Sequence, residues 1–153
     1  MKKKFLFITT ILMIGFFSYS YAQDQKFTFG IGINAGTMSF TNIDKAFTFG
    51  VDFKGEYRVA ESLGVNASVG YLYELADAHL IPIMVGANYY IGESFYAGVK
   101  TGATYFINGL TFFTLSPVIG VQLGKNLDLG LQYNYYARGG GGAPLFLRLG
   151  INF

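Results

Sequence analysis

The chain has 153 residues, of which 52 % are hydrophobic, a formal net charge of +2, one histidine and no cysteine. A disulfide framework is therefore excluded, and so is a structural zinc site. Three of the 11 basic residues lie at positions 2–4, so eight basic and nine acidic residues remain in the rest of the chain. That balance leaves no basic face for nucleic acid.

The first 22 residues have the pattern of a secretory signal peptide. Lys2, Lys3 and Lys4 form a positive start, residues 5–17 are apolar, and the small residues Ser20 and Ala22 precede a cleavage site before Gln23. The apolar run of roughly 13 residues is shorter than the ~20 that a membrane-spanning helix needs. We therefore expect a signal peptide at 1–22 and a single domain at 23–153.

Beyond this leader, apolar and polar residues alternate with a period of two, which is typical of β-strands that have two different faces. The predicted strands are 26–36, 45–58, 63–74, 79–91, 95–106, 112–123, 127–137 and 144–153. The second shows the pattern most clearly, since every alternate residue from Phe47 to Tyr57 is apolar or small. Short connections at 59–62, 92–94 and 124–126 alternate with longer ones at 37–44, 75–78, 107–111 and 138–143.

Charge is absent from all eight apolar faces. An Arg or Lys that faced the middle of a bilayer would cost ~2–4 kcal/mol, which explains the exclusion. The opposite face is rich in glycine and too poor in charge to be the exterior of a water-soluble barrel. We therefore predict an all-β fold, an eight-stranded antiparallel up-and-down transmembrane β-barrel. Its charged interior positions are Asp52, Lys54, Glu56, Arg58, Glu74, Lys100, Asp128 and Arg148.

Two stretches resemble the small outer-membrane β-barrel family of Gram-negative bacteria, the OmpA/OmpX-type or porin-like domain. They are IPIMVGANYYIGESFYAGVKTGATYF at 81–106 and LFLRLGINF at 145–153. The resemblance implies a location in the bacterial outer membrane. Since the connections alternate in length, the short turns would lie in the periplasm. The resemblance also implies contact with outer-membrane lipid and lipopolysaccharide, and insertion by the barrel assembly machinery. Leu149, Ile151 and Phe153 would form the C-terminal assembly signal.

The resemblance carries no catalytic residues, because this family shares architecture more than activity. His79, the single histidine, is interpreted as a solvated residue at the outer end of the fourth predicted strand, beside Asp77. The alternative is the catalytic base of a lipid-modifying barrel enzyme, with a nucleophile from Ser39, Thr41 or Ser116. We favour a protein that is not an enzyme, with no cofactor and no metal.

The charges predicted to face the barrel interior, here called the lumen, allow two interpretations. Asp52, Lys54, Glu56, Arg58, Lys100, Asp128 and Arg148 could line a narrow channel for ions or very small solutes. They could equally form ion pairs that plug the lumen, because buried charges must be paired. Water-filled channels belong to barrels of 16–18 strands. We therefore favour the plug, in a monomer with a structural or surface-interaction role.

Overall fold

The computed structural model describes residues 27–38, 46–75, 78–107, 109–124, 126–137 and 144–153. The leader and its cleavage site lie outside these residues. The strands are β1 (Phe27–Met38), β2 (Ala46–Ala60), β3 (Leu63–Glu74), β4 (Ala78–Ile91), β5 (Phe95–Phe106), β6 (Thr111–Leu123), β7 (Leu127–Tyr133), β8 (Tyr135–Ala137) and β9 (Leu145–Asn152). No helix among the described residues is long and apolar enough to cross a membrane.

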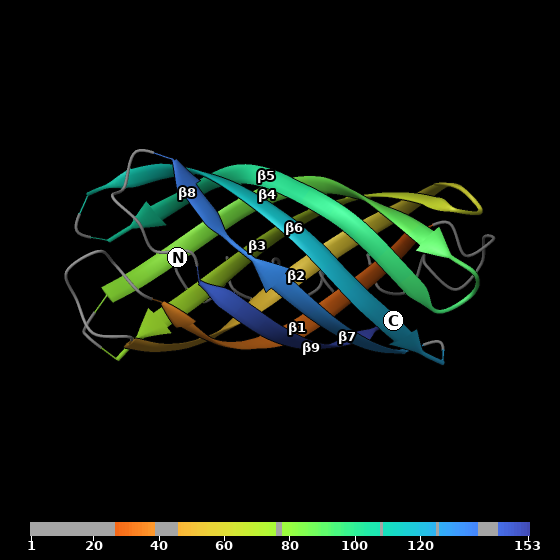
Figure 1. The fold of residues 1–153 in the computed structure, drawn as a ribbon, viewed down its shortest axis with the longest axis horizontal. Coiled ribbons are helices and arrows are strands. Elements are labelled where there is room, and N and C mark those ends of the chain that lie inside the picture. Colours follow the sequence, from red (N-terminus) through yellow and green to blue (C-terminus); the bar gives the residue numbers. More distant parts are fainter. Residues whose placement is uncertain (1–26, 39–45, 76–77, 108, 125, 138–143) are drawn as a thin grey trace, which may run out of the picture.

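The strands form one closed antiparallel sheet (Figure 1). Each strand from β1 to β6 pairs with the next along the chain, β6 pairs with β7 and β8, and β7 pairs with β9. Closure comes from β1, which also pairs with β9, for instance Ile33 opposite Leu149. β7 and β8 are two parts of a single barrel strand, so the nine strands β1–β9 make up eight barrel strands. The predicted eight-stranded up-and-down β-barrel is confirmed.

The interruption between β7 and β8 falls at Asn134, inside the predicted strand 127–137. The same register with β6 holds on both sides, because Val118 faces Gln132 and Leu115 faces Tyr135. The Asn134 backbone N–H donates to the Pro144 carbonyl at 2.9 Å. Proline has no N–H to donate in return, so the hydrogen-bond ladder is incomplete here while the strand continues.

Side chains alternate between the two faces of the wall, as the sequence predicts. Along β9 every second residue is buried and the others are exposed. Outward apolar side chains such as Phe95 and Ile33 are 63 % and 58 % exposed, whereas inward Thr104 and Asp128 are 0 % exposed. An apolar surface that runs around the whole molecule suits contact with hydrocarbon rather than water.

The connections place the short turns together at one end of the barrel. They join β2 to β3, β4 to β5 and β6 to β7. Two of them use glycine in the left-handed region, Gly92 at φ 67° and Gly124 at φ 68°, where a Cβ would be strained. At the other end, Leu75 follows β3, and Ile107 and Leu110 lie between β5 and β6.

Candidate functional site

Four strands deliver the seven predicted charges to the lumen. β2 supplies Asp52, Lys54, Glu56 and Arg58 at alternate positions, β5 supplies Lys100, β7 supplies Asp128 and β9 supplies Arg148. Because the sheet closes on itself, side chains of β2 meet those of β7 and β9 across the lumen. Asp128 and Lys54, 74 residues apart in the sequence, are joined by a hydrogen bond of 2.7 Å.

Arg148 bridges two carboxylates at the centre of this cluster. Its Nε and Nη2 donate to the Asp52 carboxylate at 2.8 Å each, and its Nη1 donates to Asp128 Oδ2 at 2.9 Å. The two-pronged contact with Asp52 is the geometry in which charge-assisted hydrogen bonds are strongest. Asn34 also donates to Asp52, at 2.6 Å. Glu56 is not a partner of Arg148, because its ion pairs are with Lys54 and Arg58.

Room for the guanidinium comes from a glycine on the neighbouring strand. A Cβ at Gly32 would lie 2.7 Å from the Arg148 Cζ, Nε and Nη2 atoms. That distance is shorter than any ordinary van der Waals contact. The sequence shows a glycine-rich inward face. At Gly32, the missing side chain leaves the space that the arginine fills.

A second group of contacts surrounds Asp128, which is fully buried. Its Oδ2 accepts from both Lys54 and Arg148, and its Oδ1 accepts from the Tyr96 hydroxyl at 2.8 Å. Lys54 Nζ also lies 3.8 Å from Glu56 Oε2, which links the central cluster to the next carboxylate along β2. Two cations and a phenol thus compensate one carboxylate in a place without water contact.

Towards the short turns, Glu56 organises a ring of polar and aromatic side chains. It accepts from Asn88 Nδ2 at 2.8 Å and from the Tyr90 hydroxyl. Arg58 approaches it at 3.4 Å and stacks on Tyr90, with the guanidinium carbon 3.3 Å from the ring centroid. Such stacking combines cation–π attraction with packing of the planar guanidinium.

Two inward charges stand apart from these pairs. Lys100 is 6 % exposed and its Nζ lies 3.4 Å from Gln132 Oε1. Among the described residues, no carboxylate lies within ion-pair distance of it. Glu74 is also buried, four residues along β3 from the Gly70 that pairs with Asp52. That separation is about 13 Å along a strand.

Between Glu74 and the charged cluster the lumen is apolar, which sequence reasoning missed. Buried large side chains meet there from five strands: Leu72, Leu80, Phe106, Tyr136 and Phe146. They occupy inward positions within the same alternation that carries the charges. The sequence does carry a sign of this apolar layer, because large apolar residues occur on both faces of the strands at this end of the barrel.

The residues considered for an enzyme are not brought together. His79 lies on the outward face of β4, where its Nδ1 is 2.5 Å from the Tyr71 hydroxyl and its ring packs on Tyr73. His79 thus belongs to β4, as the predicted strand 79–91 has it. Ser116 is fully buried in the lumen and donates to Asn134 Oδ1 at 2.7 Å, on the other side of the wall. Ser39, Thr41 and Asp77 lie outside the described residues.

Comparison with known proteins finds similarity in structure and none in sequence. No profile of a protein family matches the chain, and no curated sequence does. Neisserial surface protein A matches with a TM-score of 0.71 at 19 % identity, over 84 % of this chain and 96 % of that chain. Ail, the attachment invasion locus protein of Yersinia pestis, matches with a TM-score of 0.64 at 15 % identity, over 83 % and 97 %.

The outer-membrane enzyme PagL matches with a TM-score of 0.63 at 14 % identity, over 80 % of this chain and 98 % of that chain. The fold is that of the small outer-membrane barrels of the OmpA/OmpX type. Barrels of this type include an attachment protein and an enzyme, so the fold does not decide the activity.

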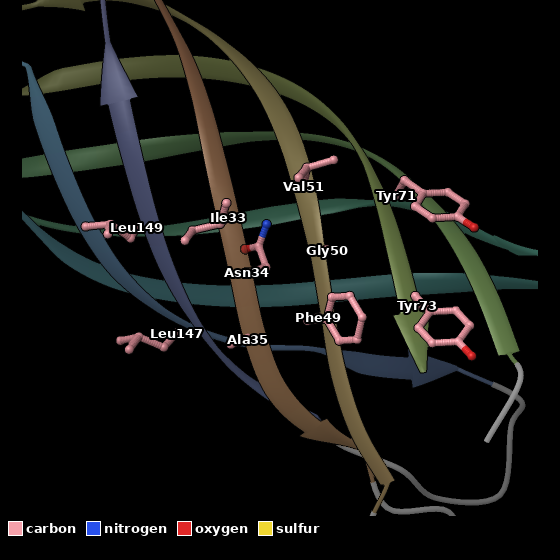
Figure 2. Close-up of a pocket in the computed structure, with 10 residues that line it drawn as sticks. All are labelled: Ile33, Asn34, Ala35, Phe49, Gly50, Val51, Tyr71, Tyr73, Leu147 and Leu149. Carbon is pink, nitrogen blue, oxygen red and sulfur yellow. The ribbon is translucent and has the colours of Figure 1, made fainter. Parts of the chain in front are cut away.

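On this small outer-membrane-type barrel, the outward wall carries a shallow groove of about 560 Å³ across β9, β1, β2 and β3 (Figure 2). One of its lining residues is Ala35, whose small side chain lies between Leu147 on β9 and Phe49 on β2 in the strand register. Tyr71 and Tyr73 bound it on β3. Figure 2 shows the Phe49 ring directed towards Tyr73, away from Ala35.

Proposed function

We propose that the chain is an integral protein of the bacterial outer membrane with a structural or surface-interaction role, whose lumen is sealed by ion pairs. The observation that supports it is the interlocked set Lys54–Asp128–Arg148–Asp52. Its three contacts measure 2.7, 2.9 and 2.8 Å, and none of the four side chains is more than 13 % exposed. An eight-stranded barrel is just wide enough for side chains to fill it, and these side chains cross it.

The seal is layered, which further supports the proposal. The apolar cluster around Phe146 lies towards the long connections, and the Arg58–Tyr90 stack lies towards the short turns. An ion that entered from either end would meet a tightly packed layer before the central ion pairs. Separating Arg148 from its two carboxylates would leave buried charge uncompensated, which is strongly unfavourable.

The test of the seal is conductance of the purified protein in planar lipid bilayers. The parent is expected to show no current steps. The matched variant combines Arg148→Ala with Asp52→Ala, which removes both side chains of one ion pair. Current steps in this variant alone would identify the ion pairs as the seal. Current steps in the parent would instead support the narrow channel for ions or very small solutes.

We further propose that outer-membrane lipid, including lipopolysaccharide, is the main partner of the outward wall of a monomer. The uncharged outward face and the groove at Ala35 support this proposal, because hydrocarbon chains fit an apolar surface that water does not. Export by the leader at 1–22 and delivery to the barrel assembly machinery precede insertion. We propose that the outward Leu149 and Ile151, with Phe153 at the end of β9, form the signal that the machinery recognises.

The protein is proposed to have no enzymatic activity. The separation of His79 and Ser116 on opposite faces of the wall supports this, because a base must lie within hydrogen-bond reach of its nucleophile. The test is an assay of lipid modification in outer membranes from cells that express the parent or His79→Ala. Equal lipid profiles are expected. A product made by the parent and lost in His79→Ala would establish the lipid-modifying enzyme instead.

A further inference from the structure

Without Glu74, which lies beyond the apolar cluster, the charges at the centre of the lumen do not balance. The seven predicted charges comprise the cations Lys54, Arg58, Lys100 and Arg148 and three carboxylates. All three carboxylates have cationic partners: Arg148 for Asp52, Lys54 and Arg148 for Asp128, and Arg58 with Lys54 for Glu56. One positive charge is left over, and Lys100 is the cation without a carboxylate beside it among the described residues.

The nearby carboxylate of Asp52 is already committed to other donors. Its Oδ1 accepts from Arg148, and its Oδ2 accepts from both Arg148 and Asn34. Glu74 does not contribute either, because Leu72 and its apolar cluster lie between it and Asp52 along β3. Neither Asp52 nor Glu74 therefore compensates the positive charge of Lys100.

Lys100 also borders a cavity of about 30 Å³ inside the barrel, below the apolar cluster. Polar residues in its lining are Asn34, Asp52, Ser68, Gln132 and Asn134. A cavity needs about 10–15 Å³ to hold one water molecule. A chloride or bromide ion has about twice that volume or more, and the cavity has room for one such ion. Gluconate, a six-carbon anion, is too large for this space.

An ammonium group has three N–H donors, and the Gln132 contact uses one of them on Lys100. A buried charge needs an opposite charge nearby, and a neutral water molecule does not supply one. We infer that the lumen binds one small monovalent anion of the halide class in the cavity beside Lys100. The anion compensates the charge of Lys100.

The first test measures unfolding by urea of the folded protein in detergent micelles, at constant ionic strength, in chloride, bromide or gluconate. Gluconate is the control anion because it cannot enter the cavity. A ligand that binds only the folded state lowers the unfolding constant by the factor 1 + [L]/Kd. A halide at about ten times its Kd should therefore lower the constant about tenfold.

Three variants give the test its specificity. Lys100→Met removes the surplus charge and is expected to abolish the halide effect. Ser68→Asp places a carboxylate in the same cavity while keeping the lysine, so it should abolish the halide effect as well. The Ser68→Asp variant still tests the inference if Lys100→Met does not fold. Lys125→Met, between β6 and β7, is the control and should retain the full halide effect.

The second test is anomalous diffraction from crystals grown in bromide. A peak in contact with Lys100 Nζ is expected in the parent and not in Lys100→Met. The inference is overturned if chloride and gluconate give equal unfolding constants, or if the halide effect survives in Lys100→Met. Anion binding and the seal fail separately, because conductance measures the seal and the salt dependence of unfolding measures the anion.

Discussion

Arg148→Ala is the substitution that most directly tests the ion-pair interior. It removes a side chain that is 4 % exposed and leaves two carboxylates without their shared partner. Asp128 keeps Lys54 at 2.7 Å and Tyr96 at 2.8 Å, so its charge stays compensated. Asp52 keeps only Asn34 as a hydrogen-bond donor among the described residues, but its side chain is 13 % exposed.

Breaking a buried pair from one side costs about 3–5 kcal/mol. Since Asp128 stays paired and Asp52 borders an interior cavity large enough for a water molecule, we expect a loss near the lower end, about 3 kcal/mol in the free energy of unfolding. That loss raises the unfolding constant by about two orders of magnitude. Urea titration of the refolded protein in micelles measures it, with far-ultraviolet circular dichroism as the signal because the chain has no tryptophan.

Two comparisons make the measurement specific. Arg58→Ala removes an arginine that is 28 % exposed near the end of the barrel, so it should cost about 1 kcal/mol or less. Arg148→Met combined with Asp52→Asn removes both charges and should recover part of the loss, because apolar replacement of a whole pair is often tolerated. If Arg148→Ala unfolds within about 0.5 kcal/mol of the parent, as exposed substitutions do, the ion pairs do not hold the interior together.

Three other outcomes are expected. Gly32→Ala should lower the free energy of unfolding by about 1–3 kcal/mol, because its Cβ would overlap the buried guanidinium. Gly55→Ala is the control and should be near neutral, because its Cβ would lie 3.6 Å from the nearest atom. Equal urea midpoints of the two variants would refute this. Phe153→Ala should accumulate unfolded in the periplasm, and normal heat-modifiable mobility with normal membrane levels would remove the assembly role. A cysteine at Gly140 should react with an impermeant reagent in intact cells, and one at Glu93 only after the outer membrane is opened; labelling of both in intact cells would contradict the topology.

The sequence alone determines the wall of the barrel closely. The predicted strand 63–74 matches β3, 95–106 matches β5, and 45–58 differs from β2 by one residue at its start and two at its end. This precision has a physical cause. A strand with one face in hydrocarbon and one in the lumen cannot shift by a single residue without moving every charge into lipid. The same constraint gives the residues of each strand their side of the wall.

Only the tertiary structure decides which side chains meet inside the barrel. Alternation tells that Arg148 and Asp52 both point inward, yet their contact depends on β9 and β2 lying on either side of β1. It also depends on Gly32 leaving room between them. The apolar cluster at Phe146 is likewise invisible in a periodic pattern, and so is the lack of a described carboxylate within ion-pair distance of Lys100. Period two fixes the face of each residue, whereas strand closure and register fix its neighbours across the lumen.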